Sequence, residues 1–183
     1  AYNGEKVIFT GGKTVPSDEI KKVTDEAVLG RIYDSAAKSK LLSVDLGKYY
    51  SEIPEIPEYS HNNDAKGNGA TIFRTQVRPV VNGQSLKRAQ WPNEDEDELK
   101  ITAVSDDKTT LTLEKNVSEH ASRWADVSGV RAVGHMTSGA TWTYQDYKIS
   151  SVENNIVTMP AKENYYPQKD GLFRFYDILE EID

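Results

Sequence analysis

The second half of the chain has the alternating apolar and polar pattern of short β-strands. From residue 70 onward, short segments rich in Val, Ile, Thr and aromatic residues are separated by turn signals. Asn82-Gly83 is the strongest of these signals, because Asn-Gly favours a tight two-residue hairpin. The turns at 105–108 and 153–155 predict two more hairpins. The expected strands cover residues 71–81, 84–91, 99–104, 109–113, 141–152, 156–159 and 172–176.

Closely spaced strands of this kind are typical of a mainly β domain, and they predict an antiparallel β-sandwich or a small β-barrel. In the strand expected over 109–113, Leu111 and Leu113 share one face and Thr110 and Thr112 the other, as period two requires. Residues 124–133 fit neither a strand nor a helix clearly, and residues 177–183 predict a short helical turn. We expect residues 70–183 to contain more strand than helix.

The first 60 residues have a different pattern. A short strand is expected at Lys6–Thr10, before a Gly-Gly break. Pro16 and the acidic residues after it favour a helix start, and helical spacing of apolar residues predicts a further helix over 25–37. Residues 41–46 are a possible strand, and the polar segment 58–69 is the best linker candidate. A short helical connector therefore precedes the β domain.

Composition and charge narrow the possible functions. The 183 residues suit one domain with a small appendage, and 37% hydrophobic residues exclude a disordered or membrane-spanning chain. The formal charge of −7 disfavours nucleic acid and anionic membranes as partners, because both repel an acidic protein. The chain has no cysteine, so it forms no disulfide, and this fits the cytosol as well as many secreted proteins.

No catalytic or cofactor motif is present in the sequence. There is no Gly-x-Ser-x-Gly elbow, no phosphate-binding loop and no dinucleotide loop. His61, His120 and His135 lack the local spacing of zinc ligands. The acidic run Glu94–Glu98 has oxygen ligands for calcium but no EF-hand spacing, so a solvated loop is the simpler interpretation. We expect no cofactor, with calcium at this run as the alternative.

Aromatic residues with polar edges crowd the last third of the chain. Trp142 and Tyr144 share one face of an expected strand, about 7 Å apart, which approximates the spacing of neighbouring sugars. We expect them to form a carbohydrate-binding platform, with Trp124 or Tyr147 beside it. The alternative for each is a place in the hydrophobic core. The hydrogen-bond acceptors expected around the platform are Asp126, Gln145 and Asp146.

Three segments together resemble a known arrangement. Residues 1–12 (AYNGEKVIFTGG) resemble an early coil of the right-handed parallel β-helix of bacterial carbohydrate-active enzymes. Residues 81–93 (VNGQSLKRAQWPN) resemble a hairpin of a β domain inserted into that helix, and residues 173–183 resemble its return segment. Members of this family include glycoside hydrolases of the β-xylosidase and α-fucosidase kinds. Gln90 and Asp177 depart from the family pattern.

The resemblance implies that residues 1–15 are a partial β-helix rung, 16–60 a helical connector and 61–183 the inserted antiparallel β domain. The family's catalytic carboxylates lie on later coils, so it implies no catalytic residue here. The expected function is non-catalytic carbohydrate binding within a larger secreted, extracellular protein that degrades glycans such as plant cell-wall polysaccharides. The expected partners are a polysaccharide or oligosaccharide and the rest of the parent protein.

Two alternatives to a binding domain stay open. In the first, the β domain is a structural insert that packs on the β-helix or on a neighbouring subunit without binding glycan. In the second, it is part of a hydrolase or lyase and contributes to the active-site cleft of that enzyme. The Lys6–Thr10 strand is expected to pair with whatever sheet edge is available, because an unpaired edge strand is prone to such pairing.

Overall fold

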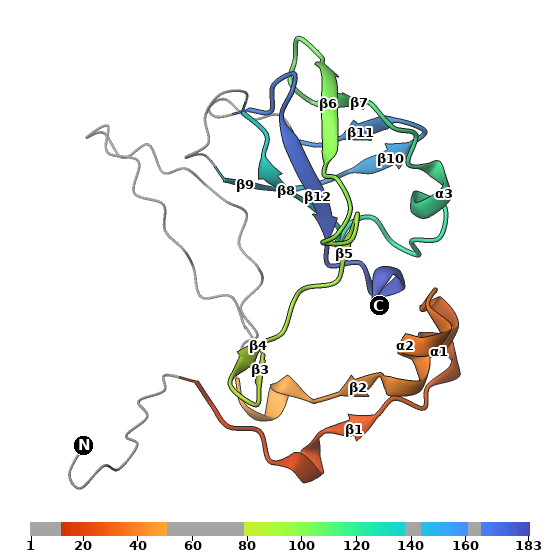
Figure 1. The fold of residues 1–183 in the computed structure, drawn as a ribbon, viewed down its shortest axis with the longest axis vertical. Helices are drawn as coiled ribbons and strands as arrows, with labels where there is room; N and C mark the ends of the chain where they lie inside the picture. Colours follow the sequence, from red (N-terminus) through yellow and green to blue (C-terminus); the bar gives the residue numbers. More distant parts are fainter. Residues whose placement is uncertain (1–11, 51–78, 138–143, 161–165) are drawn as a thin grey trace, which may run out of the picture.

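The structure, a computed structural model, describes residues 12–50, 79–137, 144–160 and 166–183. Within these ranges the chain is mainly β, as predicted: twelve strands pair antiparallel, and the three α-helices are short. Most of the helix lies before residue 41, and most of the strand lies after residue 79. Figure 1 shows α1 (Glu26–Arg31), α2 (Ser35–Lys40), β1 (Lys21–Lys22) and β2 (Leu42–Ser43) on one side of the molecule, the main sheet on the other, and the strands β3 (Val80–Val81) and β4 (Gln84–Ser85) beside β2.

Eight strands form the sheet of the β domain. They are β5 (Gln90–Trp91), β6 (Leu99–Val104), β7 (Thr110–Leu113), β8 (Arg131–His135), β9 (Gln145–Lys148), β10 (Ser151–Glu153), β11 (Ile156–Thr158) and β12 (Leu172–Tyr176). Their order is β10-β11-β7-β6-β12-β8-β9, and β5 also pairs with β12. The strand β12 lies between β6 and β8 and so joins the β6–β7 and β8–β9 hairpins, while the β10–β11 hairpin pairs with β7. Figure 1 shows β12 near the middle of the domain.

The two ends of this strand order are neighbours in the sequence. Only Ile149 and Ser150 separate β9 from β10. The Ile149 N–H donates to the Val130 carbonyl (3.3 Å) on the β8 side, and the Ser150 N–H donates to the Thr158 carbonyl (2.7 Å) on the β11 side. A link of two residues between the ends forces the sheet to curl on itself, although strand pairing does not close it.

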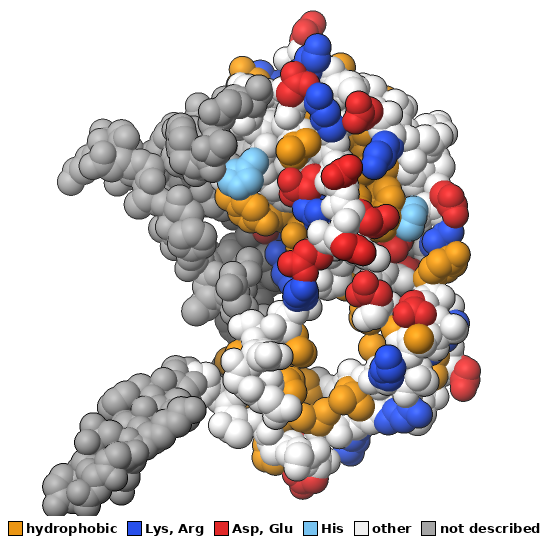
Figure 2. All heavy atoms as spheres, in the orientation of Figure 1, with side chains coloured by type: hydrophobic (Ala, Val, Ile, Leu, Met, Phe, Trp, Pro, Cys, Tyr) orange, Lys and Arg blue, Asp and Glu red, His pale blue; other side chains and the backbone are white. Residues whose placement is uncertain are grey.

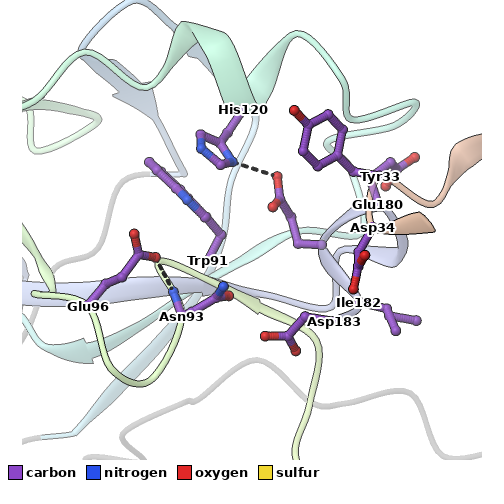
Figure 3. A pocket seen from close by; sticks show the side chains of 10 residues that line it. Tyr33, Asp34, Trp91, Asn93, Glu96, His120, Glu180, Ile182 and Asp183 are labelled. Carbon is purple, nitrogen blue, oxygen red and sulfur yellow. Dashed lines mark hydrogen bonds and ion pairs between the residues drawn. The ribbon is translucent and has the colours of Figure 1, made fainter. Parts of the chain in front are cut away.

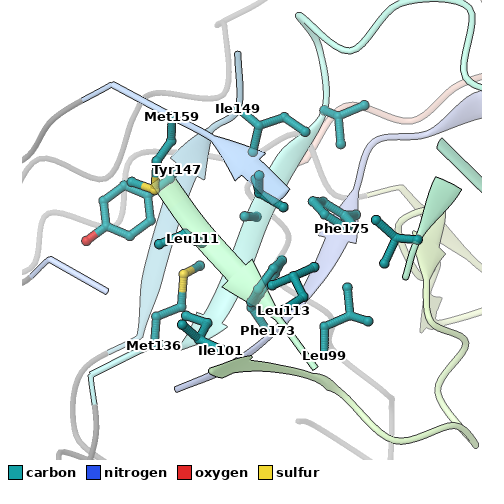
Figure 4. Close-up of a cluster of buried hydrophobic side chains, with 14 of the residues drawn as sticks. Leu99, Ile101, Leu111, Leu113, Met136, Tyr147, Ile149, Met159, Phe173 and Phe175 are labelled. Carbon is teal, nitrogen blue, oxygen red and sulfur yellow. The ribbon is translucent and has the colours of Figure 1, made fainter. Parts of the chain in front are cut away.

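The concave side of the curled sheet encloses the core. Phe173 and Phe175 of β12 are completely buried, and leucines 111 and 113 of β7 point to the same side, as the alternating pattern predicted. Figure 4 shows these side chains converging from opposite strands. The other buried apolar residues of this core are Leu99, Ile101, Val117, Trp124, Val130, Ala132, Met136, Tyr147, Ile149, Val157, Met159 and Ile178.

The connector is more broken up than the sequence predicted. It contains η2 (Ser17–Glu19), β1 (Lys21–Lys22), α1 (Glu26–Arg31), α2 (Ser35–Lys40), β2 (Leu42–Ser43) and η3 (Leu46–Lys48), and β1 pairs with β2. The single helix expected over 25–37 is two helices, because Ile32 is extended and buried, and Asp34 caps a new helix through the Ala36 N–H (2.8 Å). A 3₁₀ turn replaces the helix expected after Pro16.

The Asn-Gly hairpin is confirmed. Asn82 and Gly83 have φ of 52° and 80° and join β3 (Val80–Val81) to β4 (Gln84–Ser85). The strand expected over 84–91 is interrupted, so that only its last two residues join the main sheet as β5. The turn at the chain's end is present as η4 (Leu179–Glu181), whereas α3 (Ser118–Ala121) was not predicted. The expected Lys6–Thr10 strand lies outside the described residues.

Candidate functional site

The structure describes three of the four aromatic residues expected to form the platform. Trp124 and Tyr147 belong to the core, with 6% and 3% of their surface exposed, so neither ring is available for stacking on a sugar. Trp142 lies outside the described residues. Tyr144 is 47% exposed, and its ring meets His135 edge to face at 5.2 Å. Burial and the neighbouring Tyr176 hydroxyl raise the pKa of Tyr144 to about 12, so it stays neutral at physiological pH.

The acceptors expected around that platform already have partners within the chain. Gln145, which is 1% exposed, accepts from the Met136 N–H (3.0 Å) and donates to Thr137. Asp146 is buried against Arg131, with which it forms an ion pair. Asp126 accepts from the backbone and hydroxyl of Ser128 and so stabilises a turn. These side chains therefore shape the fold.

A hollow of about 180 Å³ lies where the connector meets the β domain. Figure 3 shows the side chains around it, which come from β5, the loop after it, α3, the link between α1 and α2, and the segment that ends the chain. Figure 2 shows acidic side chains gathered over the surface between α3 and β5. The residues lining the hollow are Tyr33, Asp34, Trp91, Asn93, Glu96, His120, Glu180, Glu181, Ile182 and Asp183.

Aromatic rings form two sides of the hollow. Trp91 stacks on His120, with ring centres 4.0 Å apart and planes at 22°, and lies parallel to Phe175 below it. Tyr33 stands across the hollow with 63% of its surface exposed, and the guanidinium of Arg123 lies over its ring at 3.8 Å. One aromatic wall is thus fixed by the core, and the other is carried by the connector.

Two glutamates of the chain's last turn fix the floor of the hollow. Glu181 accepts from Trp124 Nε1 (2.9 Å) and contacts His120 Nδ1 (3.0 Å), which orients both rings. Glu180 is 3% exposed and accepts from the Arg31 guanidinium (2.8 and 2.9 Å) and the Ala125 N–H (3.0 Å). These contacts join the connector to the β domain.

Three further carboxylates at the hollow have no Lys or Arg partner within the described part of the chain: Asp34, Glu96 and Asp183. Glu96 is held in place because its carboxylate accepts from the Asn93 N–H (2.8 Å) and its carbonyl accepts from Arg174 (2.6 Å). Asp34 caps α2 through one oxygen. Each of these groups retains acceptor capacity for a ligand.

The sequence did not reveal this hollow because its residues come from five separated segments. Trp91 appeared in the sequence only as part of a structural hairpin motif, and Tyr33 only as one position within an expected helix. The one local signal was an aromatic residue followed by Pro92 and Asn93, which places a ring at a turn. The acidic run at 94–98 was identified, but its acids pair with Lys87, Arg174 and backbone rather than with one another.

Comparisons with protein-family models, with curated proteins and with solved structures found no match. Among the described residues, no group of three or more His, Asp or Glu side chains is placed to hold a metal ion. None of the helices in the described ranges has the length and apolar character that a membrane crossing requires.

The Glu180 contacts predict a pH-dependent stability. Burial alone would raise the pKa of Glu180, but the hydrogen bonds from Arg31 and Ala125 outweigh it and hold the pKa below its ordinary value of 4.5. A carboxyl with a depressed folded pKa stabilises the protein above pH 4.5, and that stability is lost as pH falls through the folded pKa. We expect Glu180→Gln to lower the free energy of unfolding by about 2 kcal/mol at pH 7.

Thermal melts from pH 7 to pH 3 test this expectation. The gap in melting temperature between the parent protein and Glu180→Gln should narrow as the pH falls. Glu119→Gln is the matched control, because Glu119 pairs with Arg123 but is 82% exposed, and it should leave stability unchanged. A gap that is constant across this pH range contradicts the assignment.

Proposed function

We propose that the domain binds carbohydrate in this hollow and catalyses no reaction on it. The observation that carries the proposal is the pair of aromatic walls, Trp91 with His120 on one side and Tyr33 on the other, around a floor of oxygen acceptors. A sugar ring presents apolar C–H faces and a rim of hydroxyl donors, and this arrangement complements both.

The walls and floor are held before any ligand arrives. Glu181 fixes the His120 and Trp124 rings, and Arg174 fixes the loop that carries Glu96. A preorganised site loses less conformational entropy on binding, so a small contact area yields measurable affinity. The proposal is also consistent with the sequence resemblance to an insert of a glycan-degrading β-helix protein, in which binding and catalysis belong to different parts.

Variants of two exposed tyrosines distinguish binding in this hollow from binding at the platform expected around Trp142. Tyr33→Ala should weaken binding at least tenfold, because it removes one wall of the hollow. Tyr144→Ala, an equivalent loss of an exposed ring elsewhere, should leave binding unchanged. Affinity electrophoresis against plant and bacterial polysaccharides, followed by calorimetry with oligosaccharides, measures both.

If binding is lost in Tyr144→Ala and kept in Tyr33→Ala, the binding site is the Trp142–Tyr144 platform and not the hollow. Binding unaffected by either variant excludes both locations. If no polysaccharide retards the protein, the binding function itself fails.

A structural role is the second candidate, and a separate observation favours it. Exposed large apolar side chains concentrate on the connector and the β3–β4 hairpin, where Figure 2 shows apolar groups beside an opening in the molecule. Two-stranded ribbons such as β1–β2 and β3–β4 have little stability alone. A domain that packs this side on another protein body would cover Ile20, Leu42, Val44, Val80, Val81 and Leu86. Failure of all polysaccharides in the electrophoresis favours this role.

A further inference from the structure

We infer that the sugar taken by the hollow carries an amine, so that its ligand is a glycan with free amino-sugar units rather than uronic acids. The inference rests on the proposed function and adds the charge of the ligand. It is carried by two features of the same cavity, the nature of its rings and the balance of its charges.

The rings are suited to a cation. The faces of Trp and Tyr rings are electron-rich and attract ammonium and guanidinium groups placed over them. The structure already shows this chemistry at the hollow, where the Arg123 guanidinium lies 3.8 Å from the centre of the Tyr33 ring. Tyr33 is nevertheless 63% exposed and lines the cavity opposite Trp91. The Trp91 ring is stacked on His120 and lies parallel to Phe175, so Tyr33 is the ring whose face a protonated amine in the hollow contacts.

The charges point the same way. Five carboxylate side chains line the hollow, and among the described residues no Lys or Arg does. Arg31 balances Glu180, and the Trp124 N–H and His120 satisfy Glu181. Asp34, Glu96 and Asp183 have no Lys or Arg partner in the part of the chain that the structure describes, so these residues give the hollow a negative potential. An ammonium group on the ligand neutralises this charge, whereas the carboxylate of a uronic acid is repelled by it.

The dimensions limit how much ligand enters. A hollow of about 180 Å³ is smaller than the usual range of drug-sized pockets, so it encloses one sugar unit while the rest of the chain lies outside. The contact is therefore with a single amino-sugar residue, and the affinity per site is modest. Binding of this kind depends on ionic strength, because salt screens exposed charge pairs.

Calorimetry with three tetrasaccharides tests the inference: one of glucosamine units, its fully N-acetylated counterpart and one of galacturonic acid units. We expect the glucosamine form to bind about tenfold more tightly than the N-acetylated form, and the galacturonate form not to bind. The preference should shrink in 1 M NaCl, where the screening length falls to about 3 Å.

Charge-removing variants locate the effect. Glu96→Gln and Asp34→Asn keep the backbone hydrogen bonds of these residues, and each should reduce the preference for the amine two- to fivefold. Asp106→Asn, on the exposed turn between β6 and β7, is the matched control and should leave the preference intact. A preference for the amine that neither Glu96→Gln nor Asp34→Asn changes overturns the inference.

The binding results distinguish failure of the amine inference from failure of the proposed carbohydrate binding. If the N-acetylated tetrasaccharide binds as tightly as the glucosamine form, and Tyr33→Ala abolishes both, carbohydrate binding stands and the amine inference is wrong. If no tetrasaccharide and no polysaccharide binds, both are wrong.

Discussion

Replacing Phe175 with alanine is expected to lower the free energy of unfolding by about 4 kcal/mol and to weaken ligand binding at the hollow. The Phe175 ring is fully buried on β12 and lies between the core and the aromatic wall. It meets Phe173 and Trp124 edge to face at 5.2 and 5.1 Å, and lies parallel to Trp91 at 6.4 Å. Its loss removes packing from the core and the support beneath Trp91.

Urea denaturation measures the stability of this variant, and calorimetry on the folded fraction measures its binding. Leu172→Ala is the matched control from the same strand, since Leu172 is 37% exposed, and it should cost less than about 1 kcal/mol. A stable Phe175→Ala variant would show that the Phe175 ring contributes little to the packing of β12.

Replacing Gly134 with alanine is expected to cost about 3 kcal/mol, because the sheet has no room for a side chain there. Gly134 is on β8 opposite Phe173, and a Cβ at this position would lie 2.3 Å from the Leu172 carbonyl oxygen and 2.5 Å from the Phe173 Cα. Both obstacles are backbone, so relief requires moving β8 away from β12 and breaking part of their pairing.

Gly129→Ala is the control for Gly134→Ala. A Cβ at Gly129 meets nothing within 4 Å, so this variant should be neutral or slightly more stable, owing to the lower entropy of its unfolded chain. Equal melting temperatures for the two variants would contradict the close approach of β8 and β12.

Turn residues and alternating apolar positions in the sequence predicted the hairpin and the strand whose structure depends on neighbouring residues alone. The Asn82-Gly83 turn formed because both residues tolerate positive φ, and the alternation at 110–113 placed Leu111 and Leu113 in the core. In the connector, helix capping and apolar periodicity favour different structures. Apolar spacing favoured one helix, but the Asp34 carboxylate offered a new start, and burial of Ile32 favoured the break.

The candidate site could not be found by such rules. Tyr144 lies just before β9 and is exposed, whereas Gln145, Asp146 and Tyr147 are all buried, so period two does not describe this segment. Burial of Trp124 and Tyr147 depends on how the sheet curls, and that is decided by the pairing of distant strands. The hollow depends likewise on contacts between residues as far apart as Arg31 and Glu180. The proposed platform at Trp142 and Tyr144 stays a prediction, which the two tyrosine variants test.

The contact between Arg31 and Glu180 makes docking of the connector and occupancy of the hollow thermodynamically linked. Arg31 and Tyr33, whose N–H donates to the Glu180 carbonyl (3.1 Å), anchor the connector next to the wall that Tyr33 provides. If the connector swings away, the hollow loses that wall and its affinity for ligand. By reciprocity, a bound ligand strengthens docking by the same free energy. Any force or partner that acts on the connector therefore also acts on the affinity of the hollow.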